Sequence, residues 1–469
     1  MRKKLIQNAD WVITMDTKKN RYRNCDILIE NNEILKIGKN LEVDSNDTEI
    51  INGSGMIALP GFVNTHHHCW QSLFRNITVA NGLTLEPWLN VVYDMFQEIT
   101  PEVVEAGATV ALGELLKTGC TTSMDHHYAF PSTTSTELID HQIKIANKLG
   151  IRFHPTRGSI TLPIEKSAPH MKKILVSNEE QVLADSERLI KKYHDPEKFS
   201  MLRLGLAPCW HGFDSTERVL KETLELARRN GIYSHTHLAE SRAEVETCLE
   251  KFGCRPVEYM RRMGWLGKDI YFAHGVQFND EEVKLIAETG TGIAHCPVSN
   301  MFLNSGVCRV SDLLKAGGNV GIGVDGAASN NSSNMMTEIR IAYLAHQLLY
   351  GNNGPTAEQI LEIATIGGAK VLGRDDIGYL ASGMAADIVL LNWNQLQYAG
   401  GCNDPVACIV MSGDSKMVDT VLVNGKVVVR KGTLTTIDED KEKDWINRVG
   451  KEMMIRASVR QEGLKKDIY

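Results

Sequence analysis

Several short segments of the chain carry residues that bind metal ions or move protons. The first is NTHHHCWQ (64–71), in which one residue separates His66 from His68. Alternate side chains of a β-strand share a face, so this spacing predicts two imidazoles side by side and His67 on the opposite face. Imidazole nitrogen suits zinc and other first-row divalent metals. We predict that His66 and His68 are metal ligands, although a lone H-x-H pair also arises by chance, and that His67 is structural.

The second segment is HTHLAE (235–240), which follows an apolar run. His235 and His237 share a face of the expected strand, and His237 lies nearer its carboxyl end. We therefore expect His237 to be the third metal ligand and His235 to fill the barrel interior. Glu240 follows three residues later, within reach of a molecule bound at the metal, and is predicted to carry protons.

Two further runs end in FAHG and GVDG. His274, in the first, is a fourth imidazole. Asp325, in the second, can act as both ligand and base, although an isolated aspartate at such a place is often a helix N-cap. Chance would rarely put all these residue types at successive strand ends, so we predict that they form one site.

The elements that must position these residues lie between 59 and 385. Eight apolar runs alternate there with amphipathic, helix-length segments, which predicts a (β/α)₈ TIM barrel, with a doubly wound open sheet as the alternative. Every run ends on polar residues, and a barrel places its site at the carboxyl ends of its strands. The expected helices include Pro101–Lys117, Thr216–Arg229 and Ala243–Met263.

Both ends of the chain contain short β-rich runs with turn residues between them. Residues 1–58 and 386–435 are predicted to form one small β-sandwich domain, so that 59–385 is the barrel. The tail at 436–469 is charged and helical, without identifiable chemistry.

Composition limits the classes of function. The chain has 469 residues, 43% hydrophobic and 23% charged, and a formal charge of −7, which argues against broad nucleic-acid binding. No window approaches 18 consecutive apolar residues, and the start lacks the features of a signal peptide, so we expect no membrane association. Ten scattered cysteines without CxxC pairs indicate reduced thiols and a cytoplasmic location.

PGFVNTHHH, HTHLAE, FAHG and GVDG resemble the amidohydrolase superfamily, in its branch of aminohydrolases and triazine hydrolases. The resemblance covers nearly the whole chain. A narrower similarity to the 8-oxoguanine deaminase and isoxanthopterin deaminase group rests on NTHHHCWQSLFRN, SMDHHYAFP, TRGS, HCPVSNM, VDGAASNNSSNMM and NDPVACIVMSG. The fourth run, MLRLGLAPCWH, has no lysine of the kind that holds the second ion of related two-metal barrels, so one metal is expected.

The resemblance implies a zinc-dependent amidohydrolase, a cyclic amidine deaminase acting on C–N bonds other than peptide bonds. One divalent ion, zinc or alternatively ferrous iron, would be held by His66, His68, His237 and Asp325 and would lower the pKa of a bound water. Asp325 would accept the water proton and His274 would orient the hydroxide. Glu240 would protonate the ring nitrogen next to the attacked carbon.

The expected substrate is an aminated purine- or pterin-like heterocycle, foremost 8-oxoguanine, which would yield urate and ammonia. The alternatives are isoxanthopterin and a triazine that loses chloride or an alkylamine. A non-catalytic binding barrel is a remote third interpretation, because none of the six site residues is missing. A homo-oligomer is expected by analogy alone.

Four side chains are predicted to contact the substrate: Gln71, Arg75, Arg157 and Trp210. Amide and guanidinium donors can bind the carbonyl edge of a purine-like ring. Surface ion pairing is the alternative for the arginines, and packing for Trp210. Other polar residues near the strand ends are expected either to contact substrate or to pack (His126, His127), or to fix loops by hydrogen bonds (Ser299, Asn300, Ser329, Asn330).

Overall fold

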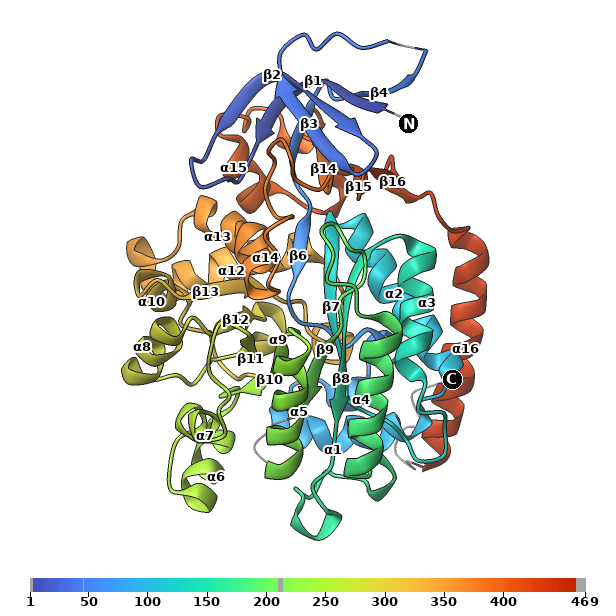
Figure 1. Ribbon diagram of the computed structural model, residues 1–469, viewed down its shortest axis with the longest axis vertical. Helices are drawn as coiled ribbons and strands as arrows, with labels where there is room; N and C mark the ends of the chain where they lie inside the picture. Colours follow the sequence, from blue (N-terminus) through green and yellow to red (C-terminus); the bar gives the residue numbers. More distant parts are fainter. Residues whose placement is uncertain (1–2, 45, 210–213, 461–469) are drawn as a thin grey trace.

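A closed barrel of eight parallel strands forms the centre of the computed structural model, which describes residues 3–44, 46–209 and 214–460. The strands follow one another around the barrel in chain order, and the last, β13, closes onto the first, β6 (Figure 1). The predicted (β/α)₈ barrel is confirmed. Its strands are β6 (Phe62–Asn64), β7 (Cys120–His127), β8 (Arg152–Ser159), β9 (Gly205–Pro208), β10 (Ser234–Leu238), β11 (Ile270–His274), β12 (Gly292–His295) and β13 (Asn319–Ile322).

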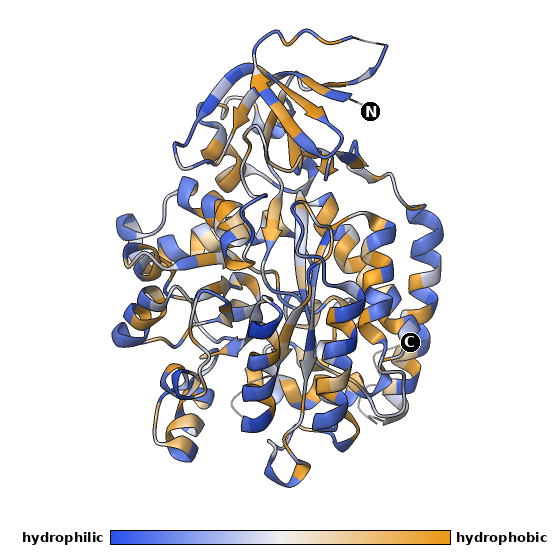
Figure 2. Ribbon diagram, viewed as in Figure 1, coloured by the Kyte–Doolittle hydropathy of each residue, from blue (hydrophilic) through white to orange (hydrophobic). Residues whose placement is uncertain are grey.

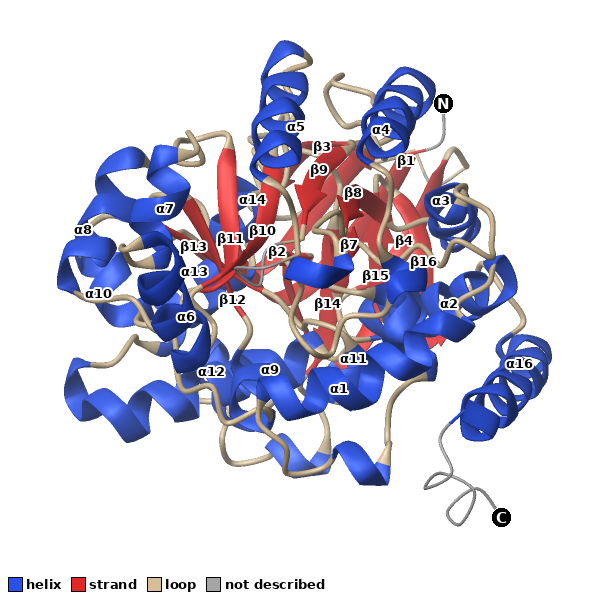
Figure 3. Cartoon of the chain, turned by 90° about the horizontal axis from the view of Figure 1, so that it is seen from below, coloured by secondary structure: helices blue, strands red, loops and turns tan. Residues whose placement is uncertain are grey.

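Helices surround the barrel strands, as the view from the end opposite the small sheet shows (Figure 3). They carry apolar residues toward the strands and polar residues outward (Figure 2), which is the pattern of amphipathic helices packed on a sheet. The helices are α1 (Leu85–Met95), α2 (Pro101–Lys117), α3 (Leu138–Leu149), α4 (Glu179–Tyr193), α5 (Glu217–Arg229), α6 (Arg242–Phe252), α7 (Pro256–Arg262), α8 (Asp280–Thr289), α9 (Pro297–Phe302), α10 (Val310–Lys315), α11 (Ala327–Asn330), α12 (Met335–Tyr350), α13 (Ala357–Ala364), α14 (Ile366–Val371), α15 (Pro405–Ala407) and α16 (Glu439–Arg460).

Local sequence signals set the helix ends. α2 begins where predicted, because the Thr100 side chain accepts a hydrogen bond from the Val103 amide (3.3 Å) and proline occupies the first helical position. The predicted single helix at Ala243–Met263 is wrong. Gly253 ends α6 in the left-handed conformation (φ 66°) and Pro256 starts α7, so the segment divides into two helices.

The strands from the two chain ends join in one mixed sheet of nine strands, which confirms a small β domain built from both termini. The central link is the antiparallel pairing of β5 with β14. β5 continues to Pro60, past the predicted boundary at 58. The strands are β1 (Lys3–Ile13), β2 (Arg21–Glu30), β3 (Glu33–Gly38), β4 (Thr48–Asn52), β5 (Met56–Pro60), β14 (Ile388–Asn392), β15 (Val418–Val423), β16 (Lys426–Arg430) and β17 (Thr433–Leu434).

The nine-stranded sheet contacts the barrel at the amino ends of the barrel strands. Arg152, the first residue of β8, forms a buried two-bond ion pair with Asp387, just before β14 (3.0 Å for each bond). The sheet therefore does not cover the opposite end of the barrel, where the carboxyl ends of the strands and the candidate site lie. α16 runs along α2 on the outside (Figure 1). Among the described residues, no helix is both long and apolar enough to span a bilayer.

Candidate metal and catalytic site

The predicted histidine ligands follow a barrel strand rather than lying on it. β6 ends at Asn64, so the strand alternation predicted for the three histidines is wrong. Hydrogen bonds fix the segment instead: Asp125 of β7 accepts the Cys69 amide (2.5 Å), and His68 Nδ1 lies 2.7 Å from the carbonyl of His126. The side chain of His68 is therefore oriented by the neighbouring strand, and not by its own.

The hydrogen bonds determine which ring nitrogens carry protons. A carbonyl can only accept, so the proton of neutral His68 is on Nδ1, facing the His126 carbonyl, and its Nε2 is a bare lone pair. In the same way, His235 Nδ1 donates to the Tyr271 carbonyl (3.1 Å), and His235 Nε2 accepts from His66 Nδ1 (2.9 Å). His66 Nε2 is then also unprotonated. His235 thus orients a predicted ligand, which is more than the packing role expected for it.

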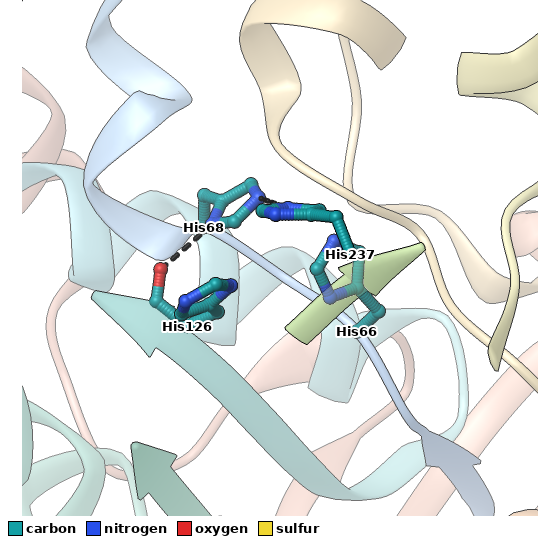
Figure 4. A group of neighbouring side chains, drawn as sticks. All are labelled: His66, His68, His126 and His237. Atoms are coloured by element: carbon teal, nitrogen blue, oxygen red, sulfur yellow. Dashed lines mark hydrogen bonds between the residues drawn. The ribbon is translucent and has the colours of Figure 1, made fainter. Parts of the chain in front are cut away.

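These lone pairs converge on one carboxylate oxygen. Asp325 Oδ1 lies 3.3 Å from His66 Nε2 and 3.4 Å from His68 Nε2. His237 Nε2 lies 3.2 Å from His68 Nε2, and the three imidazoles gather around a common space (Figure 4). The side chains are almost completely buried. Acceptor atoms this close, shielded from water, repel one another unless a cation lies between them.

The spacing fits a divalent ion. Tetrahedral zinc ligands about 2.0–2.1 Å from the metal are roughly 3.3–3.4 Å apart, which matches the three distances around Asp325 and His68. The set of three imidazoles and one carboxylate also suits zinc or ferrous iron chemically. His126 belongs to the same cluster: its Nε2 donates to the carbonyl of Ala207 (2.7 Å), which leaves its Nδ1 unprotonated. The four predicted ligands are therefore brought together.

Asp325 is held as a carboxylate. Its second oxygen accepts the Ser299 hydroxyl (2.6 Å), and Oδ1 also accepts the Gly326 amide (2.7 Å). Burial opposes ionisation, whereas these two hydrogen bonds favour the carboxylate form. The residue has a left-handed backbone (φ 61°), an uncommon conformation that is frequent at functional sites.

Glu240 and His274 face each other beside this set. Glu240 Oε2 lies 3.4 Å from His274 Nε2. Burial, reinforced by the charge of Asp325, raises the pKa of Glu240 well above its usual range. Burial lowers the pKa of His274 to about 4, and its Nδ1 lies 3.0 Å from the Asn300 side-chain amide. The site thus contains two carboxyl groups in different environments: both oxygens of Asp325 accept hydrogen bonds, whereas burial favours the protonated form of Glu240.

A small cavity of about 20 Å³ joins these groups. Its walls are His68, Gln71, Leu85, Trp88, Leu89, Tyr128, His237, Glu240, His274, Leu303, Asp325 and Ser329. Gln71 is positioned as predicted: Nε2 lies 3.4 Å from the Tyr128 hydroxyl, and Oε1 has no hydrogen-bond partner among the described residues. A methyl group on Gly326 would collide with this amide, so the glycine leaves room for the Gln71 side chain.

The other predicted substrate contacts lie elsewhere. Arg75 lies 3.9 Å from Glu114 and lines a separate cleft of about 1070 Å³ between the barrel, the sheet domain and α16. Arg157 is buried, bonds Asp185 (2.8 Å) and stacks over Phe130. Ion pairing thus occupies both arginines, and neither belongs to the candidate site. Trp210 is outside the described residues.

Several histidines and hydroxyls have supporting roles. His67 bonds Ser333 (3.0 Å) and does not line the cavity, and the ring of His127 packs between Trp70 and Phe130. Ser299 and Asn300, expected to fix loops, bond the catalytic side chains themselves. Sequence reasoning missed Tyr128 and the orienting role of His235, because each depends on contacts between distant segments.

The protein is a closed (β/α)₈ barrel with imidazoles and carboxyl groups gathered at the carboxyl ends of its strands, where barrel enzymes have their sites. Residues 57–428 match the model of the amidohydrolase family, and the chain belongs to that family.

Relatives support this membership. The chain is 42% identical to 8-oxoguanine deaminase of Pseudomonas aeruginosa, over 81% of this chain and 84% of that one. It is 35% identical to hydroxydechloroatrazine ethylaminohydrolase of Pseudomonas sp. (strain ADP), over 91% of both. Among solved structures, atrazine chlorohydrolase from Arthrobacter aurescens TC1, complexed with zinc, is 31% identical with a TM-score of 0.90, over 95% of this chain and 100% of that one.

Proposed function

We propose that this protein is a metal-dependent deaminase that hydrolyses an aminated purine- or pterin-like heterocycle, foremost 8-oxoguanine. The observation that carries the proposal is the placement of the Asp325 and Glu240 carboxyl groups in one buried cavity, beside the unprotonated nitrogens of His66 and His68. Hydrolysis of a ring C–N bond needs a base for water and an acid for the ring. The similarity to 8-oxoguanine deaminase supports this choice of substrate.

The metal would be held by His66, His68, His237 and Asp325. Zinc is the ion favoured by this donor set, with ferrous iron as the alternative. When bound, the ion supplies Lewis acidity that brings the pKa of water near neutrality. His235 and the His126 carbonyl keep the protons of the first two imidazoles away from it.

The remaining chemistry belongs to side chains. Asp325 accepts a proton from the attacking water, which His274 orients. Glu240 protonates the ring nitrogen next to the amine-bearing carbon, which makes that carbon electrophilic. The new C–O bond forms, the C–N bond breaks, and the amine leaves as ammonia after taking the proton held by Asp325. The hydroxyl proton of the product then returns to Glu240 as the carbonyl forms. Gln71 offers a free amide oxygen to an N–H group of the ring.

The substrate requires more space than this cavity has. A volume of about 20 Å³ suits one water molecule, whereas ligand sites measure roughly 300–1,000 Å³. A second cavity of about 350 Å³ adjoins it, and Leu85 and Leu89 of α1 border both. The ring therefore enters by displacing this wall, which joins the two cavities.

A triazine-type hydrolase is the second candidate, favoured by the similarity to hydroxydechloroatrazine ethylaminohydrolase along 91% of both chains. It would use the same acid and base with a different leaving group. The leaving group therefore separates the two candidates.

The experiment is a substrate panel for zinc-loaded protein: 8-oxoguanine, isoxanthopterin, guanine, cytosine and amino-, alkylamino- and chlorotriazines. Ammonia release from 8-oxoguanine or isoxanthopterin is expected, with the rate lowered about 10³-fold in Glu240→Gln. Alkylamine or chloride release from triazines would favour the second candidate. No release from any member with zinc bound would overturn both.

A further inference from the structure

The catalytic acid follows strand β10 in a short, unusually fixed segment. Ala239 has a left-handed backbone (φ 51°), Glu240 comes next, and Ser241 then caps helix α6 by accepting the Glu244 amide (3.0 Å). Glu244, three residues after the cap, sends its carboxylate back along the chain. Oε1 accepts the Ala239 amide (2.8 Å), and Oε2 accepts the Glu240 amide (2.7 Å).

The usual capping glutamate does something different. In a capping box, the residue three positions after the cap bonds the amide of the cap itself. Helix α8 follows this rule: Asn279 is the cap, and Glu282 accepts the Asn279 amide (3.0 Å). Ser241 and Glu244 have the same spacing, and the Ser241 amide also favours the ionised form of Glu244, but the carboxylate of Glu244 additionally binds the amides of the two residues before the cap. The glutamate at this cap position thus binds the main chain of the segment that contains Glu240.

We propose that Glu244 is a positioning residue that holds the main chain of Glu240, so that its carboxyl group faces His274 and the substrate. This inference rests on the proposed function, in which Glu240 is the proton donor. Glu244 does not line the small cavity that contains Glu240 and His274, although it borders the adjoining cavity of about 350 Å³. The role proposed here belongs to its hydrogen bonds with the main chain.

The two main-chain amides explain why residue 244 is a glutamate. A carboxylate offers two acceptor oxygens and no donor, which suits adjacent N–H groups. Burial raises the pKa of Glu244 to about 7, while the hydrogen bonds from Ala239 and Glu240 favour its ionised form. Gln would keep one acceptor and turn an NH₂ group against the other amide.

Other residues bind the remaining polar groups of residues 239–241, so the role of Glu244 can be separated from theirs. The Ala239 carbonyl accepts the Gln277 amide (2.9 Å), and the Ser241 hydroxyl donates to Glu86 of α1 (2.8 Å). The amides of Ala239 and Glu240 are left to the carboxylate of Glu244. Without it, these two buried N–H groups would lose their partner and the peptide could rotate.

The test compares Glu244→Gln with Glu282→Gln, which changes a buried carboxylate at the same cap position of α8. Kinetics should show kcat lowered about 10- to 100-fold in Glu244→Gln, because a displacement of about 1 Å at a catalytic group can cost about 100-fold. KM and zinc content should stay within about threefold. Glu282→Gln should leave kcat within about threefold.

Two further measurements separate positioning from loss of stability. Hydrogen exchange should be faster at the Ala239 and Glu240 amides in Glu244→Gln alone. In a Glu240→Gln background, Glu244→Gln should lower the residual kcat no further, because the group that it positions is gone. Glu244→Asp, whose carboxylate is withdrawn by one methylene, supplies the same test if the glutamine variant does not fold.

The results distinguish the two proposals. Equal exchange and equal kcat in Glu244→Gln and Glu282→Gln would overturn the positioning role, as would the same fold-loss in both Glu240 backgrounds. If exchange is faster in Glu244→Gln but the wild-type protein turns over no member of the panel, Glu244 holds the main chain and the proposed function is overturned. Glu244 then has no role in catalysis.

Discussion

Replacing Glu240 by glutamine removes an acidic proton while nearly preserving shape. Glu240 is 2% exposed, it lines the cavity, and burial raises the pKa of its carboxyl group well above the usual range. Water therefore has little access to replace it. General acid catalysis contributes about 10²–10⁴-fold, equivalent to about 2.7–5.5 kcal/mol of transition-state free energy. We expect kcat to fall about 10³-fold in Glu240→Gln.

The assay combines ammonia release from 8-oxoguanine with metal analysis of the same samples. Zinc content should be unchanged, because Glu240 is not among the four proposed ligands. A kcat within threefold of wild type would refute the assignment of Glu240 as acid. Loss of zinc together with activity would show instead that Glu240 supports the metal set.

Three other variants test separate parts of the structure. Gly326→Ala should lower kcat/KM about 10- to 100-fold by displacing the Gln71 amide, as steady-state kinetics would show; an unchanged kcat/KM would remove Gln71 from the site. His235→Ala should weaken zinc binding about 10- to 100-fold in chelator competition, because His66 Nδ1 loses its partner; equal affinity would contradict the tautomer assignment. Burial raises the pKa of Glu338 to about 8 in the folded protein, from 4.5 in the unfolded chain. The folded state therefore binds the proton more tightly, which stabilises the fold at low pH. This stabilisation is lost as the pH rises through about 8. Wild-type unfolding free energy should therefore fall relative to that of Glu338→Gln by up to about 1.4 kcal/mol per pH unit between these values, and a constant difference in urea titrations would contradict the shift.

The barrel was predictable because its signals are local. Each apolar run is long enough to identify a strand, and caps such as Thr100 mark helix starts within a few residues. The signals that divide the predicted helix at Ala243–Met263 are also local, namely Gly253 and Pro256. We predicted one helix because the amphipathic pattern continues across them.

The candidate site was predictable as a set of residue types, and less so as a geometry. His66, His68, His237 and Asp325 could be chosen because a barrel brings the carboxyl ends of its strands to one face. Alternation along a strand was the wrong reason for the first pair. Their directions come from hydrogen bonds to His235 and to the main chain of β7.

By itself, the sequence determined the barrel strands, the β-rich character of both chain ends and the donors near the strand ends, because each depends on a local pattern. Only the tertiary structure decided that Arg75 and Arg157 pair with acids away from the cavity, that burial raises the pKa of Glu240, and that Glu244 accepts the amides of Ala239 and Glu240. A guanidinium can reach several partners, and a pKa depends on everything packed around the group. Both are set by contacts between segments far apart in the chain, which sequence spacing does not record.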